Sequence, residues 1–80
     1  MDSPYYNIME SFMILSYKKM YKLLTDRNMK EKELAIKSGV SPATISKMKK
    51  DGAVMYSDTL VKICIALDCT LNDIVELVEK

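Results

Sequence analysis

Three lysines, Lys47, Lys49 and Lys50, stand close together near hydroxyl side chains in the middle of an 80-residue chain. Ammonium groups can pair with phosphates or donate to guanine, and hydroxyl groups can contact phosphates or bases. The chain has no His, two Cys and two Gly. These numbers disfavour a nucleophile with its base, a zinc site and a glycine-rich phosphate loop. We therefore expect a binding protein without a cofactor or an evident small-molecule substrate, and not an enzyme.

The two cysteines are separated by four residues. Because no His is available to complete a metal site, we interpret Cys64 as a small buried apolar side chain and Cys69 as a loop thiol.

The net charge of +1 conceals a strong separation of charges along the chain. Residues 17–50 contain ten Lys or Arg against three acidic residues, a net +7, whereas residues 1–16 carry −2 and residues 51–80 carry −4. Such a chain can turn a basic half toward phosphates, although a run of charge is more often only a solvated surface.

Length and hydropathy favour a single domain with a small aliphatic core. Apolar residues make up 49% of the chain, and no apolar run reaches the roughly 20 residues that a membrane-spanning helix needs. The first residues also lack the basic start of a signal peptide. We expect a cytoplasmic protein without membrane contact.

The N-terminal residues 1–12 form an expected extension to a domain that covers residues 13–80. Ser3 and Pro4 form a helix-start signal, and an apolar stripe follows at helical spacing. That stripe consists of Tyr5, Ile8, Met9, Phe12 and Met13. It either packs on the domain's own core or forms a dimer contact.

Start and stop signals predict five helices after this extension, and we see no period-two pattern, so the predicted fold is all-α. The first helix runs from a Ser16 cap to about Arg27, where Asn28 ends it with a left-handed residue. Two helices then follow, over 31–38 and from Pro42 to about Lys50, and Gly39 permits the turn between them. The last two helices begin at Ser57 and Thr70, and Asp73 completes a capping box with Thr70. Their apolar stripes are Leu60, Ile63, Cys64 and Leu67 in one, and Leu71, Ile74, Val75 and Val78 in the other.

The segment EKELAIKSGVSPATISKMKK resembles the helix-turn-helix of Xre-type regulators, the group of phage Cro and lambda repressor. Small or apolar residues match the packing positions of that motif: Leu34, Ala35, Gly39, Val40, Ile45 and Met48. The likeness covers roughly residues 13–78. It implies a five-helix lambda-repressor-like DNA-binding domain, with the N-terminal segment as an optional extra short helix.

In this family the second helix of the motif enters the major groove, so the resemblance also implies roles for individual residues. Base-reading positions fall on Pro42, Ala43, Ser46 and Lys47, of which Lys47 is the strongest donor to guanine. Phosphate contacts are expected from Ser41, Thr44, Lys49, Lys50, Lys32 and Ser57, together with the backbone amides near Ser57. The implied partner is a double-stranded operator bound by a homodimer. Candidate dimer contacts are the last helix and the N-terminal stripe.

Two residues depart from the family's common pattern. Glu31 stands where a phosphate-contacting Gln is frequent, so Lys30 or Lys32 either takes over that contact or pairs with Glu31. Leu24 lies opposite Lys49 where many members have an Arg and a Glu, which makes this contact apolar. An alternative function for the same fold is a protein-binding adaptor without specific DNA readout.

Overall fold

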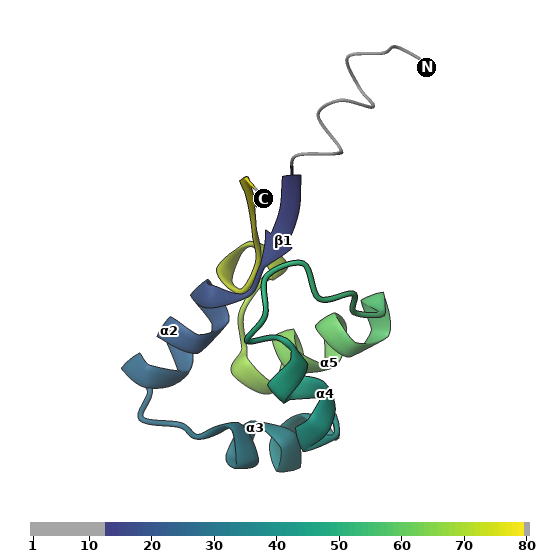
Figure 1. Cartoon of the computed structure of the whole chain (residues 1–80). Coiled ribbons are helices and arrows are strands. Elements are labelled where there is room, and N and C mark those ends of the chain that lie inside the picture. Colours follow the sequence, from purple (N-terminus) through teal and green to yellow (C-terminus); the bar gives the residue numbers. More distant parts are fainter. Residues whose placement is uncertain (1–12, 80) are drawn as a thin grey trace.

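The computed structural model describes residues 13–79 and forms a small helical domain from which a two-stranded ribbon projects (Figure 1). Its elements in order are β1 (Met13–Ser16), α2 (Lys18–Asp26), α3 (Glu31–Ser38), α4 (Pro42–Lys47), α5 (Ser57–Leu67), the 3-10 helix η1 (Leu71–Asp73) and β2 (Glu76–Glu79). The described residues thus contain four α-helices and a small sheet. The expected N-terminal helix lies outside them, except for Met13, which is in β1.

Local capping explains the start and the end of the central helices. Gly39 ends α3 with φ 77°, a left-handed conformation that costs glycine little, and its N–H donates to the carbonyl of Ala35 at 2.9 Å. Two residues later, Ser41 caps α4, since its Oγ accepts from the N–H of Thr44 at 3.2 Å. Pro42 follows as the first residue of α4, as expected from the sequence.

The helices pack around one aliphatic core. Asn28 turns the chain after α2 with φ 55°, and Met29 then packs against the core, both as predicted. The fully buried positions come from all four α-helices and from residues that flank them or η1. They include Tyr17, Met20, Leu34, Ile45, Met48, Ile63, Leu67 and Ile74. Ala35 is 7% exposed, which allows α3 to approach its neighbours closely.

The prediction of a fifth helix was wrong, and so was that of an all-α chain. Thr70 and Asp73 do form the expected cap, since the Thr70 N–H donates to Asp73 Oδ2 at 2.9 Å, but only the short η1 follows. The chain then becomes β2, which pairs antiparallel with β1 in a register that joins Leu15 to Leu77 and Ile14 to Val78. Two strands of four residues are too short to give a clear period-two pattern.

Two helix boundaries also differ from the prediction. Ser16 is the last residue of β1, and α2 begins at Lys18, although the Ser16 hydroxyl still accepts from the Lys18 N–H at 3.3 Å. The helix expected to reach Lys50 ends at Lys47, and the residues after it form turns with hydrogen bonds three residues apart. No helix in residues 13–79 is long and apolar enough to cross a membrane.

Candidate nucleic-acid interface

The helix α4 has one buried and one exposed side. Ile45 and Met48 are 0% and 1% exposed, and burial of each side chain stabilises the fold by about 1.5–3 kcal/mol. Pro42, Ala43, Ser46 and Lys47, the predicted base-reading residues, are all exposed. The buried pair therefore fixes the orientation of α4, and the four predicted residues face away from the core.

The start of α4 lies beside α3 in a shallow hollow of about 400 Å³. Lys32, Ser41 and Pro42 line it together with Ile36 and Gly39. Three predicted site residues from two helices are thus brought together at the turn of the motif. The Ser41 hydroxyl also lies 2.9 Å from that of Thr44, so these two residues, both predicted to contact phosphates, form a pair of neighbouring hydroxyls at the N-terminal end of α4.

An ion pair joins α3 to the turn after α4. Lys49 Nζ lies 3.3 Å from Glu31 Oε2, so Glu31 pairs with Lys49 and not with either of the two lysines expected from the sequence. Leu24 is 3% exposed and belongs to the core, as its apolar type indicates. The half-buried Glu31 carboxylate pairs with Lys49. Lys50 has no ion-pair partner within residues 13–79, so it is the lysine of this turn that is more available to a ligand.

A tyrosine that the sequence analysis did not single out holds the backbone of α4. The Tyr21 hydroxyl, from α2, donates to the carbonyl of Ile45 at 2.9 Å. Burial raises the pKa of Tyr21 well above its usual value, and the nearby Glu31 carboxylate raises it further. The tyrosine therefore remains a neutral donor at physiological pH. In the sequence, the only indication of this role is that Tyr21 is a polar aromatic residue on the inner side of α2.

Several basic residues of the segment 17–50 are engaged within the domain. Lys18 lies 3.6 Å from Asp51, while Lys19 and Arg27 donate to the carbonyls of Asn72 and Leu67. Within residues 13–79 no ion pair involves Lys32, Lys47 or Lys50. The ion pairs of Lys18 and Lys49 reduce the net positive charge available to a ligand, whereas Lys32, Lys47 and Lys50 keep theirs on α3, α4 and the turn that follows.

Ser57 lies apart from the hollow at the motif turn. It is the exposed first residue of α5, after Tyr56 at the N-cap, and Asp58 in the same turn pairs with Lys62 at 3.2 Å. The Asp58 carboxylate in the first turn of α5 lowers the positive potential of the amide groups at this helix start.

The exposed groups of this face are hydrogen-bond donors, hydroxyls and small apolar side chains. Residues 13–79 contain no group of three or more His, Cys, Asp or Glu side chains that could hold a metal ion. The arrangement can bind an extended anionic surface through ammonium groups and place short side chains against it.

Comparisons with known proteins agree with this geometry. The profile of the Cro/C1-type HTH DNA-binding domain matches residues 19–80. The crystal structure of the transcriptional regulator VanUg is similar to this chain with 39% sequence identity and a TM-score of 0.78, covering 86% of this chain and 91% of that one. A comparison with curated protein sequences found no match. With the helix-turn-helix geometry and a family match over most of its length, the chain belongs to the Cro/C1-type HTH DNA-binding domain family.

Proposed function

We propose that this protein is a transcriptional regulator that binds specific double-stranded DNA, with α4 in the major groove. The observation that carries the proposal is that Ile45 of α4 and Met48 at its C-cap are fully buried, whereas the opposite side of α4 exposes short residues next to Lys47. A major groove about 12 Å wide admits such a helix, and short side chains allow its backbone to approach the bases. The similar VanUg protein is itself described as a transcriptional regulator.

Roles within the site follow from position and chemistry. Lys47 donates to guanine O6 or N7, Ala43 contacts a thymine methyl, and Ser46 contributes a weak preference. Lys50, Lys32, Ser41 and Thr44 contact phosphates and set the register on the duplex. Lys49 contributes less, because Glu31 already pairs with it. Pro42 contributes shape at the helix start.

A selection from a random pool of duplexes tests this function. The proposal expects enrichment of one site with two inverted halves, whose centres lie about one helical turn apart. Recovery of a pool without a preferred sequence would contradict specific readout. That result would favour the adaptor function.

The proposal includes a homodimer that uses the ribbon. Leu15 and Leu77 are paired across the two strands, and they are 36% and 63% exposed. Alternation along a strand puts Met13 on the same side. Isolated two-stranded ribbons are marginally stable, and an exposed apolar strand favours pairing with another chain. A second copy that covers this side would bring two α4 helices to two half-sites of one operator.

Sedimentation velocity tests the dimer. Leu77→Lys is expected to convert the dimer to a monomer, because a lysine at the centre of the apolar surface would have to lose its hydration without a partner. Ile65→Lys on α5 is the matched control, since Ile65 is an aliphatic side chain that is 75% exposed outside the ribbon. A monomeric parent protein would contradict the proposal, as would a dimer that persists in Leu77→Lys.

A further inference from the structure

The end of α5 brings the only two cysteines of the chain together. Asp68 adopts the left-handed conformation with φ 51°, and its N–H donates to the Ile65 carbonyl at 3.2 Å. The N–H of Cys69 donates to the Cys64 carbonyl at 3.0 Å. These two hydrogen bonds define a Schellman motif, in which the residues at the positions of Cys64 and Cys69 commonly make a side-chain contact. Most such contacts are hydrophobic, but here both residues carry thiols.

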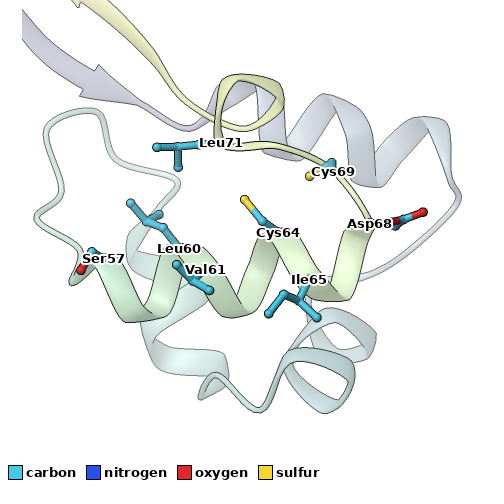
Figure 2. A pocket seen from close by; sticks show the side chains of 8 residues that line it. All are labelled: Ser57, Leu60, Val61, Cys64, Ile65, Asp68, Cys69 and Leu71. Atoms are coloured by element: carbon cyan, nitrogen blue, oxygen red, sulfur yellow. The ribbon is translucent and has the colours of Figure 1, made fainter.

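The surroundings of the two sulfur atoms agree with this geometry. Both cysteines are half-buried and line the same hollow of about 530 Å³ on α5. Figure 2 shows both sulfurs turned toward the space between α5 and the segment that follows it, with Leu71 on the far side of that space; Leu60 and Val61 also line the hollow. Burial raises the pKa of the Cys69 thiol, and so does the neighbouring Cys64. As the sequence indicates, Cys64 lies in α5 against the core and Cys69 lies in the loop that follows, but both are only half-buried and both line one hollow.

We propose that Cys64 and Cys69 form a modification site, a dithiol that closes to an internal disulfide by exchange with a low-molecular-weight disulfide. One thiol loses its proton to solvent, and its thiolate attacks the oxidant, forming a mixed disulfide and releasing one thiolate. The second cysteine, also as thiolate, then attacks the protein sulfur of that mixed disulfide and releases the other half of the oxidant. Two electrons pass from the cysteines to the oxidant, and the two released thiolates take up the two protons.

The fold favours the second, internal step over capture of a second oxidant molecule. A disulfide requires Cα atoms about 4.4–6.8 Å apart. The Schellman hydrogen bond between Cys69 and Cys64 draws these two backbones together before any reaction occurs. Leu67, which is fully buried, lies within the loop that the disulfide would close and keeps the end of α5 anchored in the core.

The test incubates the full chain with glutathione disulfide, with and without urea, traps free thiols by alkylation and measures the intact mass. The folded parent protein is expected to lose two hydrogen atoms and to resist alkylation. Cys64→Ser and Cys69→Ser, the matched controls, should each carry one glutathione. The equilibrium constant for internal closure, measured in glutathione buffers, should be at least about tenfold larger for the folded chain than in urea, because the folded chain holds the thiols together.

Three results would overturn the proposal. They are two glutathiones on the folded parent protein, a parent that stays reduced where the single variants react, and equal closure constants in the folded and urea-unfolded chains. The readout is a mass and does not depend on DNA binding, so it is independent of the proposed regulator function.

Discussion

Gly39 controls the turn between α3 and α4, and replacing it with alanine gives a measurable prediction. Its φ of 77° is a conformation that costs a residue with a Cβ about 1–2 kcal/mol. A Cβ at this position would meet no atom within 4 Å, so no steric cost adds to the backbone cost. Alanine also reduces the entropy of the unfolded chain, which returns about 0.4–1 kcal/mol. The net destabilisation expected for Gly39→Ala is therefore about 1 kcal/mol.

Urea denaturation followed by circular dichroism measures this change, which corresponds to a fall in Tm of roughly 4–8 °C for a domain of this size. Gly39→Asn should cost less, because asparagine tolerates the left-handed conformation better than alanine does. Gly52→Ala is a matched control: its φ is 85°, and the added Cβ would lie 3.6 Å from Ile14, an ordinary contact distance. We expect similar losses for the two alanine variants.

Two results would refute this reasoning. A loss above about 3 kcal/mol in Gly39→Ala would mean that the turn has close neighbours there, contrary to the open space around it. If Gly39→Ala and Gly39→Asn had the same free energy of unfolding as the parent protein, residue 39 would not adopt the left-handed conformation.

Three further predictions concern the site and its support. Tyr21→Phe should lower the free energy of unfolding in urea by about 0.5–1.5 kcal/mol, because the hydroxyl that donates to the Ile45 carbonyl is lost; an unchanged midpoint would contradict that role. The free energy of unfolding should fall as pH rises above about 10, because burial raises the pKa of Tyr17 and Tyr21 in the folded state and the tyrosines of the unfolded chain therefore ionise first. Thermal melts between pH 8 and 11 test this, and a Tm that does not change with pH would contradict it. Lys50→Ala should weaken binding to all duplexes alike and reduce the slope of affinity against salt by about one, whereas the control Lys62→Ala, which alters a lysine paired with an aspartate on α5, should leave the slope unchanged.

The helix-turn-helix could be predicted from sequence because its signals are local. Gly39, the Ser41 cap and Pro42 fix the ends of α3 and α4 within a few residues of chain, and Ile45 with Met48 fix which side is buried. Such short-range preferences depend on backbone conformations that only certain residues adopt at low cost.

The ribbon could not be predicted because its pairing is not local. Leu15 pairs with Leu77 across most of the chain, and the apolar positions 71, 74, 75 and 78 satisfy helical spacing equally well. Only the partner strand decides between a helix and a strand in so short a run.

The contacts that support the site depend on tertiary structure in the same way. The carboxylate of Glu31 indicated that this residue does not act like the Gln that is frequent in the family. The sequence, however, predicted an ion pair with Lys30 or Lys32, and the structure shows one with Lys49. Lys49 and Tyr21 reach Glu31 and Ile45 from other elements of the fold. Exposure of the four α4 residues was predicted, whereas DNA contact by them stays a prediction.

The most direct test of the central claim, that the exposed side of α4 reads base sequence, is the affinity of Lys47→Ala for two duplexes at one salt concentration. One duplex carries the selected site, and the other is a random sequence of the same length. The account predicts a loss of about 1–3 kcal/mol, roughly 5- to 150-fold in Kd, on the selected site and a much smaller loss on the random duplex. Equal losses on both duplexes would show that Lys47 contacts only phosphate and would contradict the claim.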